Sequence, residues 1–88
     1  MVEANDLKAT IEADIKNNNV MVYSKSYCPH AGATKTLLKQ KGINAKIIEL
    51  DNVDNGAAIQ QMLKEITGQG TVPNVFIKGE HIGGNSDL

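Results

Sequence analysis

The sequence is poor in the residues that build disulfide frameworks and aromatic surfaces. It contains one cysteine, Cys28, no tryptophan, and three aromatic residues in all. One cysteine excludes an intrachain disulfide framework and favours a reducing compartment, where thiols stay free. We therefore expect a cytoplasmic protein, with a mature form left after processing as the open alternative. A dithiol redox motif is excluded as well, because its second cysteine would stand at position 31, where the chain has Ala31.

The chain also lacks an excess of charge of either sign, with nine basic residues against ten acidic ones. This balance argues against binding to nucleic acids or to membrane surfaces, both of which need a basic excess. No apolar run approaches the roughly 18 residues of a membrane helix, and the start of the chain lacks the apolar segment of a signal peptide. The length fits one domain over residues 1–88.

A helix is predicted near the N-terminus by apolar residues that recur every four positions: Leu7, Ile11 and Ile15. Asn5 or Asp6 is expected to cap this helix, and the asparagines at 17–19 are expected to end it. The continuous apolar run that follows, at 20–23, predicts a strand buried on both faces.

A second helix is predicted after this strand. Pro29 suits its first turn, where the missing N–H does no harm, and Gly42 suits its C-terminal stop after about Gln40. The residues expected to point inward are Ala33, Leu37 and Leu38.

The second half of the sequence predicts a strand, a helix and a hairpin. The strand is expected at 45–50, followed by a loop with capping residues at 51–56. A helical stripe ended by Gly68 comprises Ala58, Ile59, Met62, Leu63 and Ile66. A strand at 74–77 and a short strand at 80–82 are joined by a tight turn at Lys78 and Gly79.

This order of elements predicts an α/β fold. Two strands with a helix between them form a right-handed βαβ unit, and the later hairpin adds two strands. We therefore expect a four-stranded mixed sheet with helices packed on its faces.

Cys28 is expected at the turn between the first strand and the second helix. The unpaired backbone N–H groups and the dipole at a helix N-terminus favour a thiolate, which is the nucleophilic form of cysteine.

Three motifs now support a resemblance. They are Lys25-Ser26-Tyr27-Cys28-Pro29 after the first strand, Thr71-Val72-Pro73 before the third, and Gly83-Gly84-Asn85-Ser86-Asp87 after the hairpin. In this order and spacing the chain resembles a glutaredoxin of the thioredoxin-like fold, closest to the fungal dithiol type. The resemblance covers nearly the whole chain.

The resemblance implies that Pro73 forms a cis peptide and turns the backbone of Val72 toward Cys28, where its N–H and C=O would pair with an extended peptide. From the residues alone, an ordinary trans proline at a strand start remains open. Ser86 and Asp87 would hold the γ-glutamyl end of glutathione, Asp87 at its amino group and Ser86 at its carboxylate. Plain helix capping is the alternative.

Three further side chains have an implied role and a simpler alternative. Lys25 would stabilise the thiolate and pair with the glycyl carboxylate of glutathione, or be solvated. Tyr27 would pack beside the sulfur, or be a core aromatic residue. Gln60 would reach the same carboxylate, or be solvated. The implied glutathione-binding set is Lys25, Tyr27, Gln60, Thr71, Val72, Pro73, Gly84, Ser86 and Asp87.

The active-site run departs from the family pattern. The family usually has Cys-Pro-Tyr-Cys followed by a basic residue, whereas here His30, Ala31 and Gly32 follow Pro29. The family commonly carries Arg or Lys before the threonine, where this chain has Gly70. Each lost charge should weaken glutathione binding modestly. The changed run is either a natural variant or a site engineered to trap a mixed disulfide.

The family continues with a further helix where this chain stops, so that helix is apparently missing. We expect an exposed apolar patch, or a dimer, in compensation.

These residues support three functional hypotheses. The first is a glutathione-dependent oxidoreductase that reduces protein–glutathione mixed disulfides through Cys28 alone, by a monothiol mechanism. The second is a glutathione-binding module of low activity, with a [2Fe–2S] cluster shared by two chains. The third is an engineered variant with an inert thiol. Zinc is not expected, because Cys28, His30 and His81 are a poor set for four-ligand coordination.

Overall fold

The computed structural model describes residues 4–84 of the chain. In chain order the elements are α1 (Ala4–Asn17), β1 (Val20–Ser24), α2 (Pro29–Gln40), β2 (Lys46–Glu49), the 3-10 turn η1 (Leu50–Asn52), α3 (Gly56–Thr67), β3 (Asn74–Ile77) and β4 (Glu80–Gly83). None of the described helices is long and apolar enough to cross a membrane.

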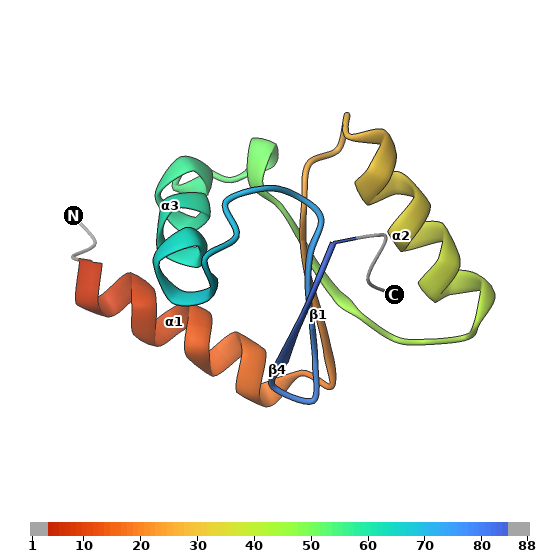
Figure 1. Ribbon diagram of the computed structural model, residues 1–88, viewed down its shortest axis with the longest axis horizontal. Coiled ribbons are helices and arrows are strands. Elements are labelled where there is room, and N and C mark those ends of the chain that lie inside the picture. The colour runs from red at the N-terminus through yellow and green to blue at the C-terminus, as the bar shows by residue number, and fades with distance from the viewer. Residues whose placement is uncertain (1–3, 85–88) are drawn as a thin grey trace.

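The four strands form one mixed sheet in the order β2-β1-β3-β4. β1 runs parallel to β2 through the α2 crossover, and β3 pairs antiparallel with both β1 and β4. The predicted mixed sheet with flanking helices is therefore confirmed. α1 and α3 cover one face of this sheet and α2 covers the other (Figure 1).

β1 is the central element of two hydrophobic clusters, and all five of its residues are buried. Successive side chains of a strand point to opposite faces, so one strand can serve both. Met21 and Tyr23 pack into the cluster with α1 and α3, while Val20 and Val22 pack with Leu38 of α2. The prediction of a strand buried on both faces is confirmed.

Several local expectations were wrong. α1 begins at Ala4, so Asn5 and Asp6 lie within the helix and do not precede it as caps. In α2 the buried residues are Ala31, Thr34 and Leu38, and Ala33 is exposed. Because leucines stand at both 37 and 38, the sequence pattern alone does not decide which of them faces the sheet. The packing against β1 shows that Leu38 does.

Smaller differences occur in the second half of the chain. β2 is shorter than expected, because Leu50 turns into η1 and packs into the core. Ala58 is exposed, although the rest of its predicted stripe is buried or partly buried. Gly68 ends α3 with a φ of 81°, a left-handed conformation that suits glycine, as predicted.

The expected apolar patch has a modest counterpart on the α2 side of the sheet. Val22 of β1 lies opposite Ile47 of β2, which is 40% exposed, and Ile43 before β2 is 38% exposed. Residues 85–88, where the further helix of the family would begin, lie outside the described residues. Dimerisation stays a prediction.

Tyr23 carries a buried polar group that the core does not satisfy. Its hydroxyl has no hydrogen-bond partner among the described residues. Its ring packs edge-on against the ring of Phe76, with 6.1 Å between the ring centroids. Burial raises the pKa of Tyr23 above its usual range, and the nearby charge of Asp14 adds to that effect. The hydroxyl therefore stays neutral and unpaired.

We expect Tyr23→Phe to stabilise the fold by about 1–2 kcal/mol, because an unpaired buried hydroxyl costs about 1–3 kcal/mol and the ring contact is kept. Urea unfolding measures the change. Tyr27→Phe is the matched control: Tyr27 is 70% exposed, so its loss of a hydroxyl should change stability by less than about 0.5 kcal/mol. A destabilised Tyr23→Phe would contradict an unpaired hydroxyl.

Alanine substitutions at two helical glycines should change stability in opposite directions. A Cβ at Gly56, the first residue of α3, would overlap the backbone carbonyl of Leu50, whereas a Cβ at Gly32 in α2 would meet nothing within 4 Å. We expect Gly56→Ala to cost about 3 kcal/mol through overpacking. Gly32→Ala should stabilise by roughly 0.5–1 kcal/mol through helix propensity. Equal effects in thermal melts would refute the predicted clash.

Candidate functional site

Cys28 lies where the chain turns from β1 into α2. It is the N-cap residue of α2, with an extended backbone at φ −85° and ψ 119°, and its side chain makes no capping hydrogen bond. Its N–H donates to the Lys25 carbonyl at 3.1 Å, and its carbonyl accepts the Gly32 N–H at 2.9 Å. The partly buried thiol is thus held at the helix N-terminus, as predicted.

The Val72–Pro73 peptide is cis and faces this thiol. The Cys28 Sγ lies 3.9 Å from the Val72 carbonyl oxygen, across 44 positions of sequence. The cis peptide and the approach of Val72 to Cys28 are therefore confirmed. Gly84, the residue after β4, lies close to the same loop, because a Cβ built on it would lie 3.6 Å from the Pro73 carbonyl oxygen.

Gln69 holds the loop that carries this cis peptide. Its side-chain amide donates to the carbonyls of Thr71 and Pro73, at 3.1 and 3.0 Å. Gln60 of α3 donates to the Gly70 carbonyl at 2.6 Å. Sequence reasoning assigned Gln60 to ligand binding and overlooked Gln69. The sequence signal for this role is a glutamine placed just before a loop whose backbone carbonyls lack partners in a helix or strand.

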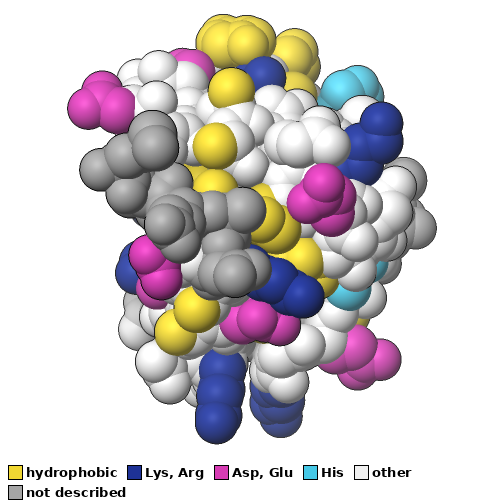
Figure 2. Space-filling view, turned by 90° about the vertical axis from the view of Figure 1, so that its left-hand side faces the viewer, with side chains coloured by type: hydrophobic (Ala, Val, Ile, Leu, Met, Phe, Trp, Pro, Cys, Tyr) yellow, Lys and Arg dark blue, Asp and Glu magenta, His cyan; other side chains and the backbone are white. Residues whose placement is uncertain are grey.

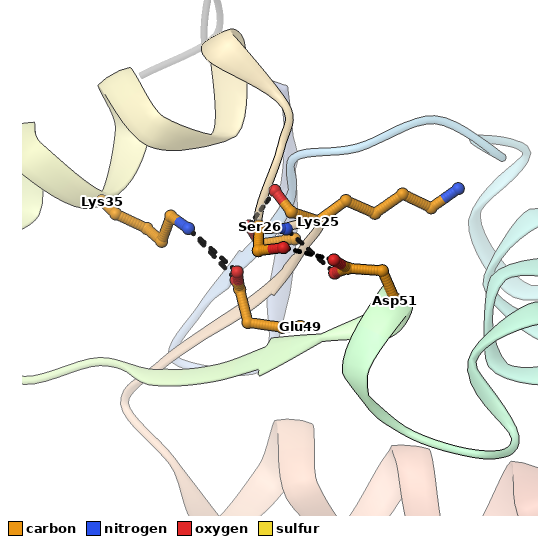
Figure 3. Close-up of polar contacts among 6 residues, drawn as sticks. Lys25, Ser26, Lys35, Glu49 and Asp51 are labelled. Atoms are coloured by element: carbon orange, nitrogen blue, oxygen red, sulfur yellow. Dashed lines mark hydrogen bonds and ion pairs between the residues drawn. The ribbon is translucent and has the colours of Figure 1, made fainter.

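A pair of hydrogen bonds between Asp51 and Ser26, termed the Asp51 clamp, holds the turn before Cys28 from the β2 side (Figure 3). The carboxylate of Asp51, in η1, accepts hydrogen bonds from the Ser26 hydroxyl and from the Ser26 N–H, the latter at 2.9 Å. These bonds, the hydroxyl first, and the nearby charge of Lys25 lower the pKa of Asp51. Sequence reasoning placed Asp51 in a loop and missed this role.

An ion pair between α2 and β2 lies beside this clamp. Lys35 of α2 contacts Glu49, the last residue of β2, at 3.1 Å, and both side chains are about a quarter exposed (Figure 3). It links α2, whose N-cap is Cys28, to the strand that leads to Asp51.

A pocket of about 480 Å³ continues from the cis-proline loop toward α3. Its lining residues are Ala57, Gln60, Gln61, Lys64, Gly70 and Thr71. Thr71 precedes Val72, so the pocket and the thiol lie along the same short segment. The structure thus brings together Cys28, Gln60 and the residues from Thr71 to Pro73.

The other predicted site residues stand differently. Tyr27 is 70% exposed, which excludes a core position. Lys25 is partly buried beside Asp51. Ser86 and Asp87 lie outside the described residues, so their predicted contacts stay predictions.

A larger pocket, of about 620 Å³, lies away from Cys28 between α1, α3 and the β3–β4 hairpin. Ile15, Ile66 and Phe76 form its apolar part. Figure 2 looks onto the α1–α3 side, where apolar side chains show as a narrow band among charged ones. Among the residues that the structure describes, the lining of this pocket contains no thiol and shares no residue with the Cys28 site.

The described residues include no group of three or more His, Cys, Asp or Glu side chains that could hold a metal ion. His81 instead contacts Asn74 at 2.9 Å and packs on the ring of Phe76. A [2Fe–2S] cluster could take only one thiolate, that of Cys28, from each chain. The predicted cluster is shared by two chains, with glutathione thiols as the remaining ligands, so cluster binding stays a prediction.

Comparison with known proteins agrees with this geometry. The glutaredoxin family model matches residues 20–82. Glutaredoxin-1 of Rhizophagus irregularis is 49% identical over 82 residues, covering 93% of this chain and 81% of that protein. The chloroplastic monothiol glutaredoxin-S12 of Arabidopsis thaliana is 44% identical over 82 residues, covering 92% and 46%. The crystal structure of a buckwheat glutaredoxin–glutathione complex superposes with a TM-score of 0.93 at 40% identity, covering 97% and 77%.

The Asp51 clamp predicts a specific pH dependence of stability. Because the pKa of Asp51 is lowered on folding, its contribution is fully present above about pH 3.9, the ordinary value for Asp, and is lost as the pH falls through the lower folded value. We expect Asp51→Asn to melt below the wild type near neutral pH, and the gap in Tm to close below about pH 4.

Thermal melts from about pH 7 to about pH 2.5 test this expectation. Asp54→Asn, an exposed acidic residue in the loop before α3, is the control and should show a small gap throughout. A gap for Asp51→Asn that does not change with pH would contradict the clamp.

Proposed function

This chain belongs to the glutaredoxin family, and from that premise we propose that it is a glutathione-dependent thiol–disulfide oxidoreductase that works through Cys28 alone. The observation that carries the proposal is the placement of the thiol. It lies at the N-terminus of α2 and 3.9 Å from the Val72 carbonyl beside a cis proline.

The reaction proceeds in two thiol–disulfide exchanges. The Cys28 thiolate attacks the glutathione sulfur of a protein–glutathione mixed disulfide; the protein thiolate leaves and takes up a proton, and Cys28 becomes glutathionylated. The thiolate of a second glutathione then attacks the glutathione sulfur on Cys28. Oxidised glutathione leaves, and the Cys28 thiolate is regenerated. One cysteine is enough for this cycle.

The backbone around Val72 supports the binding of an extended peptide thiol. A substrate lying beside the cis-proline loop would pair with the Val72 N–H and C=O as a short added strand. The glutathione bound in the buckwheat relative supports glutathione as the ligand. We propose the same ligand here, with Lys25, Tyr27, Gln60, Thr71, Gly84, Ser86 and Asp87 as further contacts.

The absence of a resolving thiol favours the monothiol route. Ala31, where a dithiol site has its second cysteine, is completely buried within the first turn of α2. A disulfide within a substrate protein would therefore be reduced only slowly, because the mixed disulfide with Cys28 has no internal thiol to release it. A relative that is named a monothiol glutaredoxin supports this proposal. Glutathionylated proteins as substrates and the cytoplasm as compartment are proposed as well.

We expect oxidised glutathione to add one glutathione to the protein, at Cys28, and excess reduced glutathione to remove it. Intact-mass spectrometry before and after digestion measures both steps. Cys28→Ser is the control and should gain nothing. An unmodified wild type would overturn the proposed function.

A further inference from the structure

The side chain of Lys64 lies against Gly70, one residue before Thr71. A Cβ built on Gly70 would lie 3.1 Å from the Lys64 Cδ and 3.4 Å from its Cβ and Cγ. Gly70 has no side chain, and the alkyl stem of Lys64 from α3 occupies the space beside it. The Lys64 side chain is otherwise exposed and lines the 480 Å³ pocket.

The pocket around Lys64 has the chemistry of a carboxylate site. Besides its ammonium group, the lining includes the side chains of Gln60, Gln61 and Thr71, which donate hydrogen bonds to anions. No acidic side chain is among these lining residues of the described chain. Lys25, by contrast, lies close enough to Asp51 to lower the pKa of that carboxyl. The lysine with the less compensated charge is therefore Lys64.

The pocket also lies at the right place relative to the thiol. Thr71 lines it, and the next residue, Val72, places its carbonyl 3.9 Å from Cys28 Sγ. In glutathione the glycyl carboxylate is one residue beyond the cysteine, and one extended residue spans about 3.3–3.6 Å. A glutathione paired with Val72 reaches the Lys64 pocket with its glycyl end.

We propose that Lys64 binds the glycyl carboxylate of glutathione across the space that Gly70 leaves open. This inference rests on the proposed function and adds a specificity-determining residue to it. Lys64 supplies from α3 a positive charge that position 70 does not carry.

The test compares two substrates that differ only in the charge of this carboxylate. One is the mixed disulfide of glutathione with 2-mercaptoethanol; the other is the same disulfide made with the glycyl ethyl ester of glutathione. The rate at which Cys28 takes up the glutathione moiety is followed by intact mass. Lys64→Ala should lower the second-order rate constant for the acid by about two- to fivefold and leave that for the ester unchanged.

Two variants control for the charge and for the helix. Lys39→Ala removes an exposed lysine from the last turn of α2, as Lys64→Ala does from the last turn of α3, and should change neither rate. Lys64→Arg keeps the charge and should keep most of the rate. Equal losses with acid and ester would overturn the proposal, because a structural defect would slow both.

A double variant tests whether positions 64 and 70 serve the same pocket. Gly70 has no positive φ, so a lysine is compatible with its backbone. Lys64→Ala removes the Cγ and Cδ atoms that lie beside position 70 and leaves only the Cβ, at 3.4 Å. Gly70→Lys in the Lys64→Ala background should restore the preference for the acid over the ester; failure to restore it would contradict the proposal. If the wild type forms no adduct, the proposed function fails. An adduct formed at equal rates with and without Lys64 overturns only the role of Lys64.

Discussion

The antiparallel pairing of β1 with β3 is the interaction on which the site depends. Its register sets Tyr23 opposite Asn74, so the chain leaving β1 toward Cys28 lies beside the chain entering β3 from Val72 and Pro73. Because the two strands run in opposite directions, the end of one and the beginning of the other meet at the same edge of the sheet. The contact between Cys28 and Val72 follows from that register, and a slip by one residue would move it.

The parallel pairing of β1 with β2 brings a third loop to the same edge. Ser24 lies opposite Glu49, so η1 begins beside the turn that leads to Cys28, and Asp51 can hold Ser26 from there. The thiol is thus fixed from two sides by backbone and carboxylate contacts. Tyr27, the residue before Cys28, is 70% exposed and takes no part in these contacts.

Much of this arrangement was predictable from the sequence, and the exceptions share a physical cause. The apolar run of β1, Pro29 at the start of α2 and Gly68 at the end of α3 are local signals, and all three held. The cis proline was implied by the resemblance to the family, and the residues alone left it open. The hydrogen bonds between Asp51 and Ser26, and the contact of the Lys64 side chain with Gly70, depend on which segments meet in the folded chain. No local sequence pattern carries that information.

The two ion pairs of β2 have a consequence for self-association. β2 is an edge strand of four residues, and the charged residues at its ends are tied to opposite layers: Lys46 to Asp14 of α1 at 2.9 Å, and Glu49 to Lys35 of α2. Exposed pairs of this kind add little stability. A further strand that paired with β2 would find only four residues to pair with and a charged residue at each end. Natural sheets use short, charged edge strands of this kind to discourage edge-to-edge aggregation. The edge strand that pairs with β1, the strand leading to the reactive thiol, is therefore poorly suited to amyloid-like growth.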